Sequence, residues 1–334
     1  MKNTDVVILN WNGQDVLPRY LSSVVENTPD AIADVIVADN ASTDGSVRYV
    51  RENYPSVRII SLDKNYGFAQ GYNRVIDMLN KKYVVLLNSD VRVTAHWLEP
   101  LIECLENDND IAAVQPKILS DRNKTKFEHA GAAGGLLDRD AYPYCYGRRL
   151  SVTANDIGQY EDVLPIFWAS GACLCIRRCD YITAGGLDAR FFAHMEEIDL
   201  CWRLKARAKQ IYYIPKSVVY HYGGATLPYN NPRKTYLNFR NNLLMIYKNV
   251  ANDKIKGLLL KRFILDIIAA LTMLFTAQWN NFISVLRAIK DFYSMKADFT
   301  TDRQINLNKT VVNEPVGWTK RSIIMDHYIF RKQP

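Results

Sequence analysis

The sequence has neither of the glycine-rich loops that hold phosphates in the two commonest nucleotide-binding folds. No G-x-G-x-x-G segment is present, which argues against a Rossmann dinucleotide site. No G-x-x-x-x-G-K-[ST] segment is present either, which argues against a P-loop enzyme. A nucleotide, if this chain binds one, must therefore be held by other means.

Residues typical of zinc sites are also scarce, with six cysteines and five histidines in 334 residues. Cys173, Cys175 and Cys179 lie close together, but their spacing matches no common zinc pattern. We expect Cys173 and Cys175 to be small core residues on one face of a strand. The chain opens on a polar MKNTD segment without a signal-peptide pattern, so we expect a reduced, cytosolic setting.

The composition, with 48% hydrophobic and 23% charged residues, is that of a folded domain or a pair of domains. The formal net charge of +7 is mildly basic. It suits an anionic substrate or an anionic membrane face without identifying either, and we expect no nucleic acid partner.

The most informative stretch is VVLLNSDVRV, residues 84–93. Its apolar start is short enough for a strand that is buried on both faces. The polar segment Asn88-Ser89-Asp90 then falls at the carboxyl end of that strand, where open α/β sheets bind ligands. A carboxylate there is placed to hold a hard cation and, through it, a diphosphate. The alternative is that Asp90 only caps a helix starting near Thr94.

Apolar runs and helical patterns alternate through the first half of the chain at the spacing of βαβ units. The expected strands are 5–10, 33–40, 56–61 and 83–87, and the expected helices are 15–26, 44–53 and 65–80. This order predicts a parallel, doubly wound sheet. Several strands end in polar clusters, which such a sheet brings to a single edge where a nucleotide can lie.

Four segments together resemble the opening motifs of the family 2 glycosyltransferases, in their rhamnosyltransferase-like branch. They are VVILNWNG (6–13), VADNASTDGS (37–46), NYGFAQGYN (65–73) and LLNSD (86–90). The resemblance implies a GT-A fold, meaning a doubly wound, mostly parallel α/β sheet. It also implies a nucleotide-sugar donor and a divalent metal, Mg²⁺ or Mn²⁺.

The same resemblance implies the donor site. Asp39 would meet the nucleoside, and Asp90 would occupy the last position of the D-x-D element. Its first position holds Asn88, which leaves Asp90 as the carboxylate ligand of the metal. The other donor-binding positions taken from these motifs are Asn10, Asn12, Asn65 and Gly67.

The segment 185–203 carries three acids at the start of a helix, Glu196, Glu197 and Asp199. Acids at a helix start suit the macrodipole without further function. The segment also resembles the family pattern E-D-x-D-L-c-w-R, in which the second acid is the catalytic base. That position holds Glu197, with Glu196 as the alternative base, while Asp199 is expected to brace the helix.

His221 ends a predicted strand pair, 211–214 and 217–221, and is followed by two glycines after one intervening residue. A hydrogen-bonded structural histidine is the ordinary interpretation. The H-x-G-G pattern resembles the metal-ligand histidine of the family, so we predict that His221 joins Asp90 at the metal.

Between about 120 and 163 the periodic pattern is lost, and we expect an irregular lid or acceptor wall there. Trp168 is interpreted either as an acceptor-stacking residue or as a core residue.

The last third, 231–334, is expected to be a helical region next to a catalytic domain at 1–230. Its first helix, 232–249, carries Arg240 in an Arg-Asn pair that recurs in the family and that we assign to phosphate or sugar of the acceptor. The most apolar stretch, 258–277, favours two packed or interfacial helices over one spanning helix. Basic residues flank this stretch, namely Lys254, Lys256, Lys261, Arg262, Arg287, Lys290 and Lys296. They suit the inner leaflet of a membrane, with dimerisation or core packing as the competing interpretations.

These observations predict a metal-dependent, inverting glycosyltransferase of the hexosyltransferase class. The donor would be a dTDP- or UDP-sugar, with rhamnose as a candidate, and the acceptor a saccharide or lipid-linked saccharide in surface polysaccharide synthesis. One alternative is a sugar-phosphate nucleotidyltransferase, although Trp11-Asn12-Gly13-Gln14 stands where its phosphate loop would be. The other is a nucleotide-sugar binding protein without catalysis, against which the three acids argue.

Overall fold

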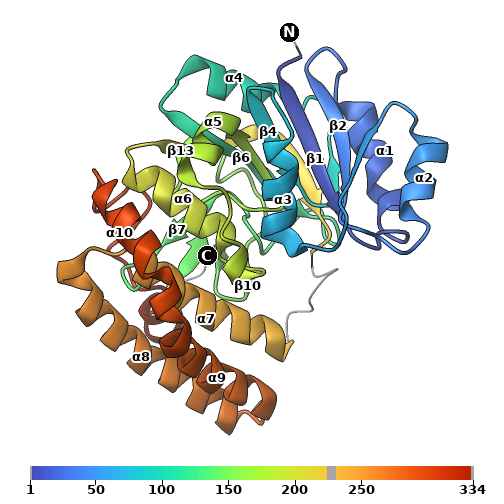
Figure 1. Ribbon diagram of the computed structural model, residues 1–334. Helices are drawn as coiled ribbons and strands as arrows, with labels where there is room; N and C mark the ends of the chain where they lie inside the picture. Colours follow the sequence, from blue (N-terminus) through green and yellow to red (C-terminus); the bar gives the residue numbers. More distant parts are fainter. Residues whose placement is uncertain (1, 224–230, 332–334) are drawn as a thin grey trace.

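The computed structural model describes residues 2–223 and 231–331. Its centre is a nine-stranded sheet in the order β11-β13-β6-β12-β4-β1-β2-β3, with β5 paired to β13 (Figure 1). The strands of this sheet are β1 (Thr4–Asn10), β2 (Ala33–Asp39), β3 (Arg58–Ser61), β4 (Tyr83–Leu87), β5 (Val91–Val93), β6 (Ile111–Ser120), β11 (Leu164–Pro165), β12 (Cys173–Arg177) and β13 (Gln210–His221). The helices are α1 (Leu17–Asn27), α2 (Ser46–Asn53), α3 (Gly67–Asp77), α4 (Glu99–Asn107), α5 (Arg178–Ala184), α6 (Glu196–Ala206), α7 (Pro232–Asn249), α8 (Asn252–Phe275), α9 (Trp279–Met295) and α10 (Thr300–Asn308).

Strands β4, β1, β2 and β3 are parallel, as the alternation of strands and helices predicts. Their side chains alternate between two buried clusters. Val6 and Ile8 face α1, α2 and α4, whereas Val7 faces α3, α5, α6 and α7. Helices thus cover both faces, which explains why each strand is a continuous apolar run. The predicted α/β, GT-A type sheet is confirmed.

The sheet becomes mixed at β12, which runs antiparallel to both β4 and β6. Cys173 and Cys175 are buried on β12 as core residues. The prediction of two strands at 211–214 and 217–221 was wrong, because β13 continues through both with a register shift between Ile214 and Val218. Lys216 and Ser217, the polar residues between the two apolar runs, lie at this register shift and do not form a turn.

The stretch 120–163 is more ordered than its sequence indicates. It contains a four-stranded sheet made of β7 (Gly135–Leu137), β8 (Pro143–Cys145), β9 (Arg148–Arg149) and β10 (Val152–Thr153). These strands have only two or three residues each, too few for a period of two to show in the sequence.

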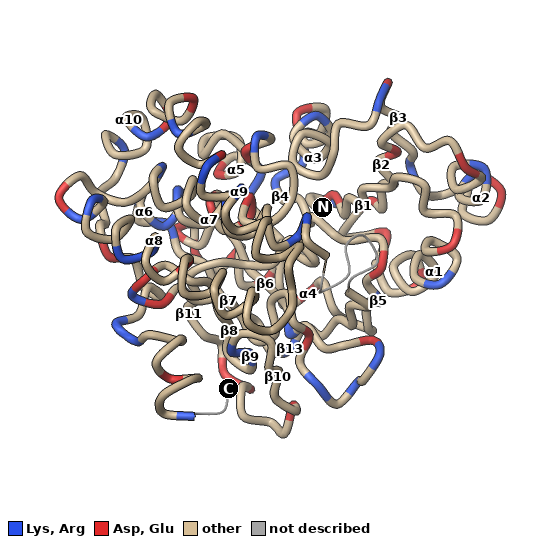
Figure 2. Tube along the Cα trace, turned by 90° about the horizontal axis from the view of Figure 1, so that it is seen from below, with Lys and Arg blue, Asp and Glu red and all other residues tan. Residues whose placement is uncertain are grey.

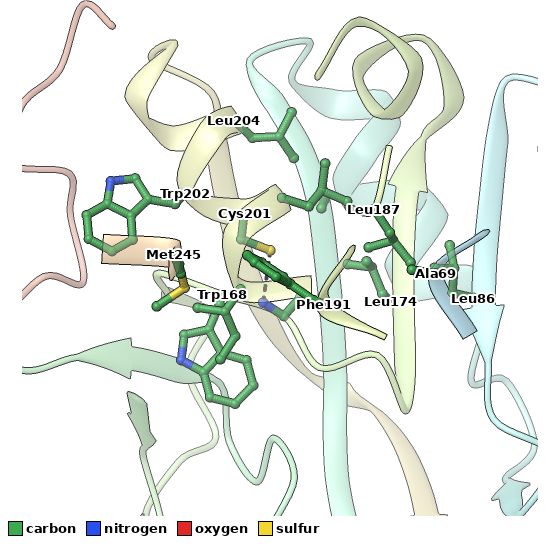
Figure 3. Close-up of a cluster of buried hydrophobic side chains, with 14 of the residues drawn as sticks. Ala69, Leu86, Trp168, Leu174, Leu187, Phe191, Cys201, Trp202, Leu204 and Met245 are labelled. Carbon is green, nitrogen blue, oxygen red and sulfur yellow. Dashed lines mark hydrogen bonds between the residues drawn. The ribbon is translucent and has the colours of Figure 1, made fainter. Parts of the chain in front are cut away.

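Trp168 lies in the core, which confirms the second of its two interpretations. Its ring packs on Gly135, where an added Cβ would come within 2.1 Å of the indole, and its Nε1 donates to the Leu136 carbonyl at 3.0 Å. Figure 3 shows the indole among buried side chains that include Cys201 and Met245. The side chain is 4% exposed and therefore cannot stack on an acceptor in this conformation.

The C-terminal region is helical as expected, and α7, α8 and α9 pack against one another beside the sheet (Figure 1). Past α10, the chain forms one π-helical turn, Met325–Ile329. No helix within the described ranges is long and apolar enough to cross a membrane. Basic and acidic residues are interspersed along the whole trace, so charge alone identifies no site (Figure 2).

Candidate active site

The pairing of β5 with β13 brings Asp90 to His221. Val91 lies opposite His221 in this antiparallel pair, so the residue before Val91 reaches the end of β13. The Tyr222 N–H donates to the Asp90 carbonyl at 3.1 Å, and Asp90 Oδ1 lies 3.1 Å from His221 Nε2. Asp90 therefore caps no helix, since β5 follows it directly and α4 begins only at Glu99.

A second carboxylate, Glu128, lies on the other side of the imidazole, with Oε2 3.3 Å from His221 Nδ1. The loop that carries it folds back along β6, where the Glu128 N–H donates to the Ile118 carbonyl at 3.0 Å. We did not predict this residue. The available signal was an acid-histidine pair, Glu128-His129, ahead of Gly131 in a segment without regular periodicity.

The two carboxylates control the charge of His221. Burial alone would lower its pKa, but Glu128 and Asp90 outweigh burial and raise the pKa to about 10. Burial would likewise raise the pKa of Glu128, and the facing His221 lowers it to about 2. Without a metal the imidazole is thus a cation between two anions, and a cation at Nε2 would replace its proton.

These residues suit a magnesium or manganese ion that is completed by substrate. Asp90 Oδ1 and His221 Nε2 are close enough to be neighbouring ligands of one ion, and Glu128 is placed to orient the imidazole. Within residues 2–223 and 231–331, no three His, Cys, Asp or Glu side chains form a complete metal site. Mg²⁺ is commonly bound by one or two protein ligands together with substrate phosphates and water, so the incomplete set fits that use.

A cavity of about 280 Å³ opens beside this pair at the carboxyl edge of the sheet. Five of the predicted site residues line it, namely Asn88, Asp90, Glu196, Glu197 and His221. Other polar residues in its wall were not predicted, namely Glu128, His129, His194 and Lys234. Gly224, the second glycine after His221, lies outside the described residues.

Asp39 forms the centre of a separate polar network at the end of β1 and β2. Asn10 lies opposite Asp39 in the register of these strands, and its amide donates to Asp39 Oδ1 at 3.1 Å. The Ser42 N–H donates to Asp39 Oδ2 at 3.2 Å, while Asn12 Oδ1 accepts from the Thr43 N–H at 2.8 Å. These hydrogen bonds fix the loop after β2. Asn10 therefore has a structural role in addition to its predicted contact with the donor.

Asn65 and Gly67 hold the start of α3 next to this network. Asn65 Oδ1 accepts from the Gly67 N–H at 2.8 Å and from the Asn40 amide at 3.0 Å. Gly67 has φ of +73°, a conformation that disfavours any side chain. Both residues of the motif thus contribute to fixing the start of α3.

Glu196 and Glu197 start α6 and line the cavity from the opposite side. Burial, followed by the negative charge of Glu197, raises the pKa of Glu196 well above the ordinary range. Burial also raises the pKa of Glu197, but main-chain N–H groups, including that of Gly171, offset part of this. Glu197 therefore ionises more readily than Glu196, although burial raises the pKa of both carboxyl groups.

The loop before α6 is strained and is held by α7. Phe192, His194 and Met195 have φ between +67° and +77°, which is unfavourable for side chains of this size. The Asn241 amide donates to the carbonyls of Ala193 and His194 at 2.9 and 2.8 Å. The strain is thus maintained next to the two glutamates, where it sets the direction of the helix start.

Arg240 supports the same loop. Its guanidinium donates to the Phe191 carbonyl at 3.1 Å and to Asn241 Oδ1 at 2.7 Å, and the side chain is buried. Arg240 does not line the cavity with Asp90. It borders a different cavity, between α7 and α9.

Asp199 is fully buried and braces α6, as expected. Its carboxylate accepts from Arg203 Nε at 3.0 Å, from Lys248 Nζ at 2.8 Å and from the Asn249 amide at 2.8 Å. Two of these three donors belong to α7, so the pair of helices is connected through one carboxylate. Opposite charges hold the pKa of Asp199 below its usual range despite burial, which by itself raises the pKa.

Replacing Asp199 by alanine should lower the free energy of unfolding by about 3–5 kcal/mol, since the buried Arg203 loses its carboxylate and Lys248 keeps only Asp188. Urea unfolding of the full chain measures this. Asp15, which is exposed before α1, gives the control, and Asp15→Ala should change stability by less than about 0.5 kcal/mol. Equal midpoints for Asp199→Ala and the native chain would contradict the role of the carboxylate.

The arrangement of the motifs in space agrees with comparisons to known proteins. The model of the family described as Glycosyl transferase family 2 matches residues 5–167, which include β1 to β6 and Asp90. The part of the chain at residues 5–167 belongs to glycosyl transferase family 2. The resemblance seen in the four opening motifs is thus confirmed.

Two curated relatives of this family 2 glycosyltransferase are rhamnosyltransferases. The N-acetylglucosaminyl-diphospho-decaprenol L-rhamnosyltransferase of Mycobacterium tuberculosis is 27% identical over 233 residues, or 65% of this chain and 75% of the relative. Rhamnosyltransferase WbbL of Escherichia coli is 22% identical over 225 residues, or 65% of this chain and 82% of the relative.

Solved structures show the same fold. Mannosyltransferase PcManGT from Pyrobaculum calidifontis, with GDP-Man and Mn²⁺, gives a TM-score of 0.54 at 14% identity, covering 93% of this chain and 86% of that one. S. aureus TarS 1-349 with UDP-GlcNAc gives a TM-score of 0.57 at 13% identity, covering 92% and 89%. The structure of GalNAc-T7 gives a TM-score of 0.58 at 16% identity, and this chain spans 49% of it.

Proposed function

We propose that this glycosyltransferase moves a sugar from a nucleoside diphosphate to a hydroxyl of a lipid-linked saccharide, with inversion at the anomeric carbon. The observation that carries the proposal is the single cavity in which Asp90 and His221 face Glu196 and Glu197. The first two supply a place for a leaving diphosphate, and the glutamates supply a base. A non-catalytic binding protein has no use for a pair of neighbouring carboxyl groups in the wall of this cavity.

The nucleoside of the donor would lie along the Asp39 network, and its diphosphate would extend toward Asp90. Asp90 and His221 would hold a Mg²⁺ or Mn²⁺ ion, which stabilises the charge of the leaving diphosphate. Asn88 would contact the donor from the end of β4. Lys234, which lines the same cavity, adds a positive charge near the diphosphate.

Glu197 would accept the proton of the acceptor hydroxyl as that oxygen attacks the anomeric carbon. The side chain is half-buried, and its buried Oε2 has no hydrogen-bond partner among the described residues, so it can accept a hydrogen bond from a substrate. Glu196, protonated beside it, would keep a second negative charge away from the attacking oxygen.

The donor is proposed to be a dTDP- or UDP-sugar, and dTDP-rhamnose is the first to test, given the rhamnosyltransferases among the relatives. Release of free nucleoside diphosphate from a panel of donors, with and without Mn²⁺, tests the proposal. Metal-dependent release supports a glycosyltransferase reaction. Release of inorganic pyrophosphate from a sugar phosphate and a nucleoside triphosphate would favour a nucleotidyltransferase, and no turnover with any pair would favour a binding protein.

Helices α8 and α9 are proposed to hold the enzyme on an anionic membrane, at the inner face of the cell membrane where a lipid-linked acceptor would be found. One stripe of α8 and its continuation on α9 expose large apolar side chains, namely Leu260, Phe263, Ile264, Ile268, Leu271, Phe275, Trp279, Ile283 and Leu286. Lys256 and Lys290 are exposed near the two ends of this stripe and suit acidic headgroups.

Arg262, counted among the flanking cations from sequence, has a different role. It is buried, packs on Tyr142 and pairs with Asp266 at 3.3 Å.

The turn between α8 and α9 gives a direct test of membrane binding. Phe275 is 85% exposed and Trp279 is 61% exposed, so replacing both by serine should leave the fold intact. Binding to phosphatidylglycerol vesicles in a sedimentation assay should fall at least about tenfold, because two large apolar side chains no longer enter the lipid. Ile157→Ser, at a side chain 83% exposed in another part of the molecule, is the matched control.

A native chain that stays in the supernatant would rule out the lipid surface as the partner of this stripe. If that chain also elutes as a dimer, and Phe275→Ser with Trp279→Ser makes it monomeric, the stripe is an interface between two copies.

A further inference from the structure

A second cavity, of about 560 Å³, lies between α7, α9 and the strained loop before α6. It is separate from the cavity that contains Asp90 and Glu197. Its lining includes three arginines, two aromatic residues and a serine, namely Arg233, Arg240, Arg287, Phe192, Tyr236 and Ser284. None of the lining residues is acidic.

The three guanidinium groups are held in different ways. Arg240 is fixed by main-chain carbonyls, as described above. Arg233 lies over the Phe192 ring at 4.7 Å, and Arg287 lies over the Tyr236 ring at 5.1 Å. Neither of these two aromatic contacts uses the N–H donors, so the end of each guanidinium can donate to a ligand.

One carboxylate lies behind the cavity wall. Asp291 accepts from the Tyr236 hydroxyl at 2.7 Å and lies 3.5 Å from Arg287 Nε. It balances one of the three positive charges, so the cavity favours a ligand with more than one negative charge. A diphosphate has that charge and enough oxygens for several N–H donors.

The two cavities share a wall. Phe192 lines the arginine cavity, while the next two residues, Ala193 and His194, line the cavity of the glutamates. In the same way Arg233 faces one cavity and its neighbour Lys234 faces the other. A ligand that occupies both would therefore place its anionic part within a few residues of the catalytic base.

On α9, the residues that line the arginine cavity are neighbours of the exposed apolar stripe. Ile283 and Leu286 are 57% and 40% exposed and alternate on this helix with the lining residues Ser284 and Arg287. An anionic group in the cavity can thus be joined to a hydrocarbon chain that leaves along the apolar stripe. The arginine cavity alone does not require a lipid diphosphate, and neither does the apolar stripe. Because the two lie next to each other, together they suit a lipid diphosphate.

We propose that the arginine cavity binds the diphosphate of the lipid-linked acceptor, with the saccharide directed to Glu197 and the lipid chain along α8 and α9. This assignment rests on the proposed function, because it specifies how the acceptor of that reaction is held. It assigns Arg233 and Arg287 to acceptor binding and makes Arg240 a positioning residue of the same wall.

Calorimetric titration with farnesyl diphosphate tests the assignment. EDTA is present, so that metal-dependent binding at Asp90 does not contribute. The variant Arg233→Gln with Arg287→Gln should weaken binding at least about tenfold, since two charge-assisted hydrogen bonds are lost. The control Arg19→Gln with Arg51→Gln removes the same charge from exposed positions on α1 and α2 and should bind like the native chain. Arg287→Gln alone, at a side chain 70% exposed, keeps the test valid if the double variant does not fold.

Three further measurements distinguish a lipid diphosphate in this cavity from free pyrophosphate, from a ligand at the donor site and from a phospholipid headgroup. Inorganic pyrophosphate should bind the native chain more weakly than farnesyl diphosphate, and equal affinity would remove the lipid from the assignment. Loss of farnesyl diphosphate binding in Asp90→Asn, with binding retained in the arginine variant, would move the ligand to the donor site and overturn the assignment. Loss of phosphatidylglycerol vesicle binding in the arginine variant, with farnesyl diphosphate binding unchanged, would make the cavity a phospholipid headgroup site instead.

Failure of the assignment and failure of the proposed function give different results. If no donor releases a nucleoside diphosphate, the proposed reaction is wrong, whatever farnesyl diphosphate does. A different result would overturn only the assignment. In that case donors are turned over, but the arginine variant and the control have the same affinity for farnesyl diphosphate and the same KM for the acceptor. The proposed reaction would then be correct and the acceptor diphosphate would bind elsewhere.

Discussion

Replacing Glu197 by glutamine should lower kcat by about 10²–10⁴-fold, which is the usual contribution of a positioned general base. Glutamine has nearly the same shape and cannot accept the proton of the acceptor hydroxyl. Donor affinity should change little, because Asp39 and Asp90, which we assign to the donor, are untouched. The measurement is acceptor-dependent release of nucleoside diphosphate, with donor affinity taken from a separate titration.

The variant Glu196→Gln tests which of the two glutamates is the catalytic base. If Glu197 is the base, Glu196→Gln should be much less damaging, since burial raises the pKa of Glu196 and favours its neutral form, which glutamine resembles. The reverse order of the two variants would transfer the base to Glu196. Glu103→Gln, on the exposed side of α4, controls for the loss of one negative charge.

The pH profile of the native enzyme gives an independent check on the base. A base works only when it is ionised, and burial raises the pKa of Glu197. The activity should therefore fall, as pH decreases, at a higher pH than for an ordinary glutamate. Glu197→Gln should lose this acid limb.

The second large effect is expected at Asp90. Asp90→Asn keeps the size of the side chain and removes its charge, so the site loses its carboxylate ligand. Turnover should fall at least about a hundredfold, and added Mn²⁺ should no longer tighten binding of the nucleoside diphosphate. Nucleoside diphosphate titration with and without Mn²⁺ measures the second effect directly.

His221→Gln separates the ligand role from the electrostatic role at this site. It removes the imidazole and should also reduce the response to Mn²⁺. Asp110→Asn, on the exposed segment before β6, is the control and should respond to Mn²⁺ as the native chain does. An unchanged response to Mn²⁺ in Asp90→Asn would remove the ion from this position.

The sequence predicted the parallel half of the sheet well because each buried strand is a continuous apolar run between helical segments. It also identified Asp90, His221 and the two glutamates, which the structure brings together in one cavity. The four motifs made this possible, since each contains polar residues directly after a strand.

Other parts could not be predicted, for physical reasons. The strands of the four-stranded sheet are too short to show a period, and Glu128 reaches His221 only because its loop folds back along β6. Trp168 had two interpretations until its contact with Gly135 placed it in the core. The buried position of Arg262 depends on Asp266 and Tyr142, and the second of these is more than a hundred residues away in the sequence.

Helix α7 holds the catalytic helix in place, although it lies beyond residue 230, where the catalytic domain was expected to end. Lys248 and Asn249 neutralise and hydrogen-bond Asp199, and Asn241 fixes the backbone that precedes Glu196. A protein shortened to its first 230 residues would retain every carboxylate needed for the reaction and lose the support that orients them. Substitutions in α7 should consequently disturb the catalytic helix, except at positions such as Arg233 that line the arginine cavity.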